Sequence, residues 1–124
     1  MIDKTDKKTL VIGASPNPAR YSNKAMHLLQ EHGHEVTGLA KRAVHTDEIT
    51  IQTNFPAGES IHTVTMYIGA VIQPEYYESI INLHPARVIF NPGTENPDFE
   101  KKLRSAGIEV IEDCTLVMLR SGKF

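Results

Sequence analysis

Five short apolar runs, separated by segments with helical patterning, constrain the fold of this chain more than any other feature. The first run, Thr9-Leu10-Val11-Ile12, is continuous and ends at a glycine. Such runs are typical of strands that are buried on both faces of a parallel sheet. The other four predicted strands are residues 34–39, 63–68, 86–90 and 108–111.

Helical segments fall between these runs. Ser22 is expected to cap a helix that runs to about His32, and Gly33 is a suitable stop after it. Further helices are predicted at residues 74–83 and 97–106, with a last helical turn or two at 115–120. The stretch 41–62 has the weakest pattern, and we expect only a short strand or extended segment around Ile49 and Ile51 there.

Strands that alternate with helices of about ten residues imply right-handed crossovers and a parallel sheet. The sequence therefore predicts an α/β fold, a Rossmann-like three-layer α/β/α sandwich with a mainly parallel sheet of about five strands. A length of 124 residues suits one domain. We expect a flexible N-terminal tail at residues 1–8 and a single domain at residues 9–124.

Charge and composition exclude several classes of protein. With 13 basic and 15 acidic residues, the chain lacks the basic excess of a general nucleic-acid binder. No apolar stretch approaches the length of a transmembrane helix, and the charged start is not a signal peptide. The single cysteine, Cys114, excludes an intramolecular disulfide and suits a reducing compartment, so a cytoplasmic protein is expected.

Ligands of doubly wound sheets bind outside the carboxyl ends of the strands. In this chain, small, hydroxyl, amide and basic residues follow the predicted strands. The candidate ligand-binding residues are Gly13, Ala14, Ser15, Arg20, Tyr21 and Ser22 after the first strand, Lys41 after the second, Ile72, Gln73 and Pro74 after the third, Asn91, Pro92 and Gly93 after the fourth, and Cys114 after the fifth.

The first of these segments suits phosphate. A turn that starts with glycine lets backbone N–H groups approach an anion, and the helix that follows adds its positive end. A Cβ at Gly13 would block that approach. Lys41 and Arg42 add two positive charges at the same edge, which favours a ligand with more than one phosphate. The same features also occur in ordinary loops, where glycine and proline punctuate turns and Lys-Arg is a solvated pair.

The residues after the first two predicted strands indicate which nucleotide could bind. An NAD-binding fingerprint needs G-x-G-x-x-G and then an acidic residue after the second strand. This chain has Ser15 at the second glycine position and Lys41-Arg42 in place of the acid. Plain NAD is disfavoured, whereas a phosphate-bearing ribose, as in NADP or coenzyme A (CoA), fits.

The motifs Val11-Ile12-Gly13-Ala14-Ser15, Arg20-Tyr21-Ser22 and Asn91-Pro92-Gly93, together with Cys114, resemble those of the small single-domain CoA-binding proteins. These are related to the nucleotide-binding domain of the succinyl-CoA synthetase alpha subunit. The resemblance covers roughly residues 7–124. It departs from the family after the second strand, where the usual Val-Asn-Pro is replaced by Leu39-Ala40-Lys41.

The resemblance implies a Rossmann-like domain that holds CoA or an acyl-CoA across the strand ends. The segments 13–15 and 20–22 would hold phosphates, and Lys41 would lie near the adenosine end. Residues 72–74 would border the adenine or the pantetheine. Cys114 is either a thiol that meets the pantetheine thiol in a mixed disulfide or a small buried hydrophobic residue.

No catalytic constellation is recognisable. The six histidines form no metal-binding motif, so no metal is expected. The leading hypothesis is a protein that binds CoA or acyl-CoA without catalysis of its own, with a nucleotide cofactor as its partner and neither nucleic acid nor membrane. An NADP- or CoA-dependent enzyme and an interaction module that has lost its ligand are the alternatives. A homo-oligomer or a protein partner stays open.

Overall fold

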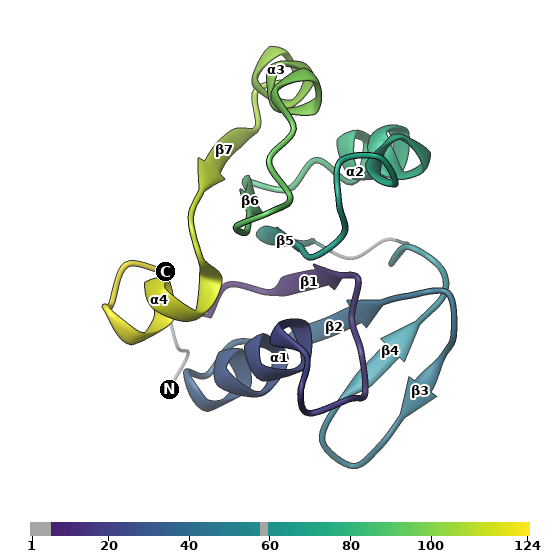
Figure 1. Ribbon diagram of the computed structural model, residues 1–124, viewed down its shortest axis with the longest axis vertical. Helices are drawn as coiled ribbons and strands as arrows, with labels where there is room; N and C mark the ends of the chain where they lie inside the picture. Colours follow the sequence, from purple (N-terminus) through teal and green to yellow (C-terminus); the bar gives the residue numbers. More distant parts are fainter. Residues whose placement is uncertain (1–5, 58–59) are drawn as a thin grey trace.

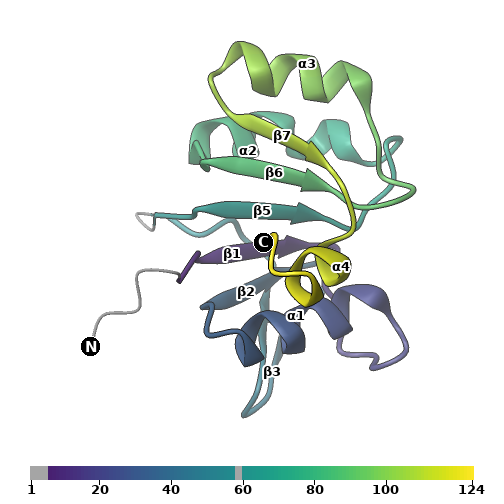
Figure 2. The same cartoon turned by 90° about the vertical axis from the view of Figure 1, so that its left-hand side faces the viewer.

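The computed structural model describes residues 6–57 and 60–124. Its centre is a seven-stranded sheet in the order β3-β4-β2-β1-β5-β6-β7 (Figures 1 and 2). The elements in chain order are β1 (Thr9–Ile12), α1 (Tyr21–Glu31), β2 (Val36–Leu39), β3 (Val44–His45), β4 (Thr50–Gln52), β5 (Thr63–Met66), the 3-10 helix η1 (Gln73–Tyr76), α2 (Tyr77–Leu83), β6 (Arg87–Phe90), α3 (Pro97–Ser105), β7 (Glu109–Glu112) and α4 (Thr115–Arg120). The chain has the predicted α/β Rossmann-like fold.

The helices cover both faces of the sheet, because successive residues of each strand point to opposite sides. Leu10 and Ile12 of β1 belong to an apolar cluster that includes side chains of α2 and α3. Val11, between them, packs instead with Met26 and Leu29 of α1. Figure 2 shows α1 and α4 together in front of the sheet. This two-sided burial explains why the apolar runs are continuous rather than alternating.

The register brings the carboxyl ends of the parallel strands to one edge. Ile12, the last residue of β1, lies opposite Leu39 on one side and Met66 on the other. Phe90 of β6 is opposite Met66 in turn, so the series continues across the sheet. In Figure 2 the arrowheads of β1, β5, β6 and β7 point to the same edge. The segments that follow these strands are therefore neighbours, as the sequence predicts.

The structure has two strands besides the five that were predicted from clear apolar runs, and one of the two matches the short strand expected around Ile49 and Ile51. The segment expected to be irregular forms a short hairpin, in which β3 runs antiparallel to β4. β4 is parallel to β2 and contains Ile51, which packs under α1. The short strand expected around Ile49 and Ile51 thus exists at Thr50–Gln52. No sequence pattern predicts the two-residue strand β3.

Two predicted helix starts are wrong. Ser22 is not a cap: it is buried in the first turn of α1, which Arg20 precedes at the N-cap position. The side chain of Asn17 makes the turn instead, since its Oδ1 accepts a hydrogen bond from the N–H of Ala19. Pro74 lies in the 3-10 turn η1, and the α-helical part begins only at Tyr77.

Residues 1–5 of the expected tail lie outside the described residues. The next residues are hydrogen-bonded to the body of the protein: the N–H of Lys7 donates to Nδ1 of His34 at 2.9 Å, and the carbonyl oxygen of Lys8 accepts from the N–H of His62 at 2.9 Å. In the described part of the chain, no helix is both long enough and apolar enough to cross a membrane.

The close approach of β2 to its neighbours yields a stability prediction. A Cβ at Gly38 would lie 2.6 Å from Cβ of Ala14 and 3.0 Å from side-chain atoms of Met26 and Ile51. We expect Gly38→Ala to lower the free energy of unfolding by about 1–3 kcal/mol through overpacking, measured by urea denaturation. Gly69→Ala is the matched control, because a Cβ there meets nothing within 4 Å. Equal stability of the two variants would contradict this packing.

Candidate functional site

A cavity of about 310 Å³ opens at the carboxyl edge of the sheet, and four candidate residues line it. Tyr21 begins α1, Asn91 and Pro92 follow β6, and Cys114 follows β7. Tyr67, the first residue after β5, completes the lining. The cavity thus joins the turns after four different strands, which are far apart in the sequence.

Asn91 organises this edge rather than offering free polar atoms to it. Its Nδ2 donates to Oγ1 of Thr65 at 2.7 Å and to the carbonyl oxygen of Met66 at 2.8 Å. Its Oδ1 accepts from the N–H of Thr115 at 2.9 Å, in the first turn of α4. All these groups are buried. One side chain therefore links the ends of β5 and β6 to the start of α4.

Gln73 is a second organising residue, and its side chain is fully buried. Its Nε2 donates to the carbonyl oxygens of Ile68 and Thr94, at 2.9 and 2.7 Å. Its Oε1 accepts from Nδ2 of Asn96 at 2.9 Å. These bonds join the segment after β5 to the segment after β6. The neighbouring candidates Ile72 and Pro74 are exposed.

The turn after β1 differs from the open phosphate cradle that its glycine suggested. The N–H groups of Gly13 and Ala14 both donate to the carbonyl oxygen of Leu39, at 3.0 and 3.2 Å. Gly13 has a φ of +89°, and a Cβ on it would lie 2.9–3.0 Å from Ile68 and Tyr67. The glycine is thus required by the packing of β1 against the segment after β5. A larger residue there would disturb the fold whether or not a ligand binds.

The donors that this turn leaves for an anion lie further along the chain. The first helical hydrogen bond of α1 runs from the N–H of Lys24 to the carbonyl oxygen of Arg20. The N–H groups of the first turn, at residues 21–23, therefore point out of the helix end without partners in the helix. No acidic residue occupies this turn. The Arg20 side chain is exposed beside it, so the positive end of α1 faces solvent next to Tyr21.

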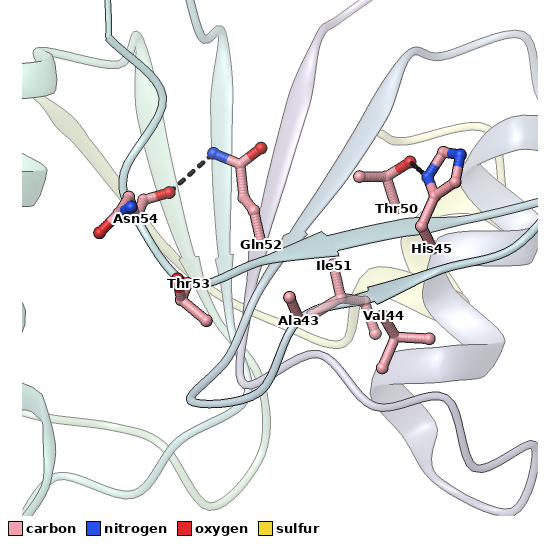
Figure 3. Close-up of a pocket in the computed structure, with 8 residues that line it drawn as sticks. All are labelled: Ala43, Val44, His45, Thr50, Ile51, Gln52, Thr53 and Asn54. Atoms are coloured by element: carbon pink, nitrogen blue, oxygen red, sulfur yellow. Dashed lines mark hydrogen bonds between the residues drawn. The ribbon is translucent and has the colours of Figure 1, made fainter.

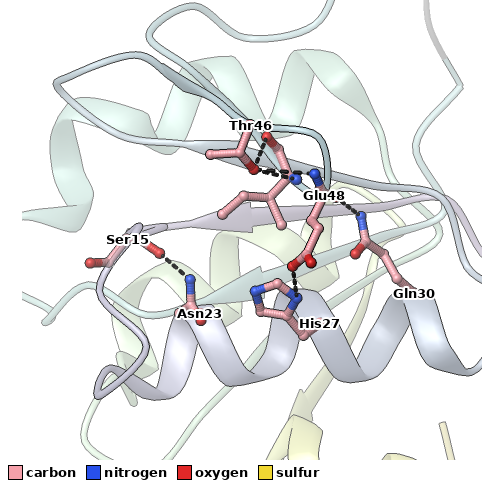
Figure 4. Close-up of polar contacts among 7 residues, drawn as sticks. Ser15, Asn23, His27, Gln30, Thr46 and Glu48 are labelled. Atoms are coloured by element: carbon pink, nitrogen blue, oxygen red, sulfur yellow. Dashed lines mark hydrogen bonds and ion pairs between the residues drawn. The ribbon is translucent and has the colours of Figure 1, made fainter.

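The shape of this turn depends on Asn23, which the sequence did not single out. Asn23 is buried, and its Nδ2 donates to the carbonyl oxygen of Ser15 at 2.9 Å (Figure 4). The Ser15 hydroxyl accepts from the N–H of Asn17 at 3.1 Å. Both ends of the turn are therefore held by local hydrogen bonds. The sequence did contain one indication of this role, because Asn23 is a polar residue on the face of α1 that is otherwise mostly apolar.

Polar contacts connect the β3–β4 hairpin to α1 next to this turn. The Glu48 carboxylate lies 3.5 Å from Nδ1 of His27, and its carbonyl oxygen accepts from Nε2 of Gln30 (Figure 4). On the hairpin itself, an open depression of about 600 Å³ is lined by residues 43–45 and 50–54 (Figure 3). None of the candidate residues lines this depression. Lys41, close to it in sequence, is exposed.

Two further candidates, Gly93 and Cys114, follow β6 and β7. Gly93 is exposed with a φ of +92°, and its N–H donates to Oε1 of Glu95. Cys114 is half-buried at the N-cap position of α4, and its N–H donates to Oδ1 of Asp113. Among residues 6–57 and 60–124, no three His, Cys, Asp or Glu side chains gather as a metal site would require.

Tyr67 is the one residue of the cavity that the sequence analysis missed, because the predicted strand 63–68 placed it inside the sheet. Its hydroxyl is buried and has no hydrogen-bond partner within the described parts of the chain. Burial raises the pKa of Tyr67 to about 12, and the neighbouring Cys114 adds to the rise. The hydroxyls of Thr115 and Thr65, which lie within hydrogen-bonding reach although they make no close bond to it, oppose the rise in part. The hydroxyl therefore stays protonated at neutral pH.

The unpartnered hydroxyl predicts an unusual effect of substitution. Tyr67→Phe should change the free energy of unfolding by less than about 1 kcal/mol, because the buried hydroxyl that it removes makes no close hydrogen bond. The matched control is Tyr77→Phe, which loses the bond from Nδ2 of Asn96 at 2.8 Å and should cost about 1 kcal/mol. Chemical denaturation measures both, and a loss of stability in Tyr67→Phe as large as that in Tyr77→Phe would contradict the assignment.

The same pair of proteins should diverge with pH. The folded state holds the pKa of Tyr67 at about 12, above the value of about 10 for an unfolded tyrosine. Because only the unfolded chain ionises between these values, the wild type should lose stability relative to Tyr67→Phe as the pH rises from 10 to 12. A constant difference over that range would contradict the raised pKa.

Comparisons with known proteins agree with this fold. A crystal structure described as an uncharacterized protein is 44% identical, has a TM-score of 0.91, and covers 96% of this chain and 98% of its own. A hypothetical protein from Pyrococcus horikoshii OT3 is 25% identical, with a TM-score of 0.85 over 94% of this chain and 84% of its own. Cell-free ID.343 from Thermus thermophilus is 22% identical, with a TM-score of 0.83 over 95% and 91%.

No curated protein matches the chain. The sequence pattern of the family described as a CoA binding domain matches residues 7–120, which is almost the whole chain. The match includes every strand and helix around the cavity. The chain therefore belongs to the CoA-binding domain family.

Proposed function

We propose that residues 9–124 form a single domain that binds CoA or an acyl-CoA at the carboxyl edge of the sheet, without a reaction of its own. One observation carries the proposal: Tyr21, Asn91, Pro92 and Cys114, from three separate strand ends, line one cavity beside the exposed N-terminal turn of α1. Membership of the CoA-binding domain family supports the same ligand.

The two ends of CoA have different requirements, and this edge meets both. The diphosphate needs N–H donors and positive charge, which the first turn of α1 and Arg20 offer. The pantetheine arm is uncharged and suits the cavity between Tyr67 and Pro92. A volume of about 310 Å³ lies at the small end of ligand pockets, so it would receive one end of the molecule and leave the nucleotide outside.

The choice of CoA over NAD rests on charge. Lys41 and Arg42 follow β2, where NAD-binding proteins carry an acidic residue for the ribose hydroxyls. Both side chains are exposed and would approach the 3′-phosphate of CoA. NADP also carries a phosphate on its ribose, so it is the competing ligand. The pKa of Tyr67, about 12, argues against this residue as a general base in an NADP-dependent reaction near neutral pH.

Ligand titration tests the proposal directly. Thermal unfolding is followed with CoA, acetyl-CoA, NADP and NAD, with reductant present. A ligand at about 100 times its dissociation constant stabilises the native state by about 2.7 kcal/mol, so CoA should raise the Tm clearly and NAD should not. A shift with NADP alone would favour the oxidoreductase alternative. No shift with any of the four would favour an interaction module that has lost its ligand.

Arg20→Ala tests the phosphate end. Arg20 is exposed, so its loss should leave the Tm of the free protein unchanged. It should weaken CoA binding by about 1–3 kcal/mol if the guanidinium makes a charged hydrogen bond to phosphate. Arg104→Ala on α3 is the matched control and should bind CoA like the wild type. If calorimetry shows that Arg20→Ala binds CoA with unchanged affinity, the phosphates do not bind at the start of α1.

The Cys114 thiol would react with CoA only by thiol–disulfide exchange. Its thiolate would attack one sulfur of CoA disulfide and release the other half as CoA thiol, leaving a protein–CoA mixed disulfide. Intact-mass spectrometry after incubation with CoA disulfide should show a gain of one CoA less two hydrogens, reversed by reductant and absent in Cys114→Ser. An unmodified wild-type protein would indicate that Cys114 is only a small packing residue, as a half-buried cysteine can be.

A further inference from the structure

The walls of the cavity at the carboxyl edge of the sheet offer few polar atoms to a ligand. Both ends of the Asn91 amide are bonded inside the protein, and its carbonyl oxygen accepts from the N–H and the hydroxyl of Thr94 at 2.9 and 2.8 Å. Pro92 has no N–H. At Cys114 the N–H donates to the side chain of the preceding residue, and the carbonyl oxygen accepts from the N–H of Met118. These polar atoms are therefore committed within the protein.

The two tyrosines of the wall add little polarity. The Tyr67 hydroxyl is inaccessible to solvent, so this residue cannot offer it to an occupant of the cavity. Tyr21 is 69% exposed, so its polar end does not need a partner inside the cavity. The surfaces that remain for an occupant are therefore largely apolar: aromatic carbon, the ring of Pro92 and the sulfur of Cys114.

Other depressions of the protein have a different character. The one on the β3–β4 hairpin has the polar side chains of Thr50, Gln52 and Asn54 in its wall. Another, of about 250 Å³, includes the cationic side chain of Lys7 and the imidazole of His32. Of these three, the cavity at the carboxyl edge is the one whose walls suit a hydrocarbon group.

We propose that this cavity binds the alkyl chain of a short- or medium-chain acyl-CoA. The inference rests on the proposed function, since it names the acyl group of the same ligand. The pantetheine arm carries amide groups, whose hydrogen bonds these walls cannot supply, so the amides stay outside and only the far end of the arm enters. A hydrocarbon chain needs no partners, and its transfer from water to apolar walls is favourable. The volume of about 310 Å³ limits the length of the chain.

The test is a series of affinities in which only the acyl chain changes. Calorimetry, with reductant present, measures the binding of CoA and of acetyl-, butyryl-, hexanoyl- and octanoyl-CoA. For the wild type, the affinity should rise about fourfold for each added methylene group while the chain fits. The heat capacity change of binding should become more negative with each step, because apolar surface is buried. The rise should stop within the series, because the cavity is small.

Substitutions at Cys114 change the size of the cavity. The Cys114 side chain makes no capping hydrogen bond, so its replacement removes none from the start of α4. Cys114→Leu fills part of the cavity, and its affinities should stop rising at a shorter chain than in the wild type. Cys114→Ala enlarges the cavity, and its affinities should rise to a longer chain. Val117→Leu is the matched control: Val117 is exposed on the same helix and does not line the cavity, so this variant should keep the wild-type series.

The other outcomes overturn the inference in different ways. Wild-type affinities that do not depend on chain length would overturn it, while the binding of CoA itself would still support the proposed function. Equal dependence on chain length in the wild type and Cys114→Leu would place the chain elsewhere on the surface. If Cys114→Leu does not fold, an unchanged limit in Cys114→Ala overturns the inference instead. If neither CoA nor any acyl-CoA binds the wild type, the inference and the proposed function fail together.

Discussion

The side-chain amide of Asn91 is the interaction on which the carboxyl edge depends. It bonds to the end of β5 through Thr65 and Met66, and to the start of α4 through the N–H of Thr115. β5 and β6 would be neighbours without it, because their backbones pair along the sheet. Strand pairing does not determine the position of α4, because this helix follows β7 at the edge of the sheet and yet packs beside α1. Asn91 provides the link, and the cavity forms at that junction.

This arrangement separates the two tasks of the site. The buried amides of Asn91 and Gln73 use their hydrogen bonds inside the protein, so they position the walls of the site and leave few atoms for a ligand. The groups that remain for a ligand are the N–H donors at the start of α1 and the exposed side chains of Arg20 and Lys41. Rigid internal amides and free peripheral donors are what a preorganised site needs, because the walls then do not have to be ordered when a ligand binds.

Much of the fold could be predicted from the sequence, because both faces of the sheet are covered. Continuous apolar runs such as Thr9–Ile12 have no other good explanation, and the glycines and prolines between them mark the turns. The β3–β4 hairpin could not be predicted in the same way. β3 has two residues, and only Val44 of the pair packs against the core beneath α1, so its pattern is too short to detect. Its pairing with β4 comes from the tertiary structure.

The candidate site was predictable in position but not in detail. Parallel strands place their carboxyl ends together, so the residues after each strand were found at one edge. The sequence could not indicate which polar atoms would be consumed internally, as those of Gln73 are, because that depends on partners 5 to 23 residues away. Tyr67 was missed for a different reason. The strand was predicted to run to residue 68, but β5 ends at Met66, so Tyr67 lies in the wall of the cavity. The end of a strand cannot be recognised from the sequence where the residues on both sides of it are apolar.

The failure to predict the position of Tyr67 from the sequence has a physical cause. Sequence patterns reflect burial, and Tyr67 is only partly buried, although its hydroxyl is inaccessible to solvent. A core position that needed only an aromatic ring would be served by phenylalanine, which avoids the cost of desolvating a hydroxyl. At Tyr67 the hydroxyls of Thr115 and Thr65 lie beside the phenol group and reduce that cost.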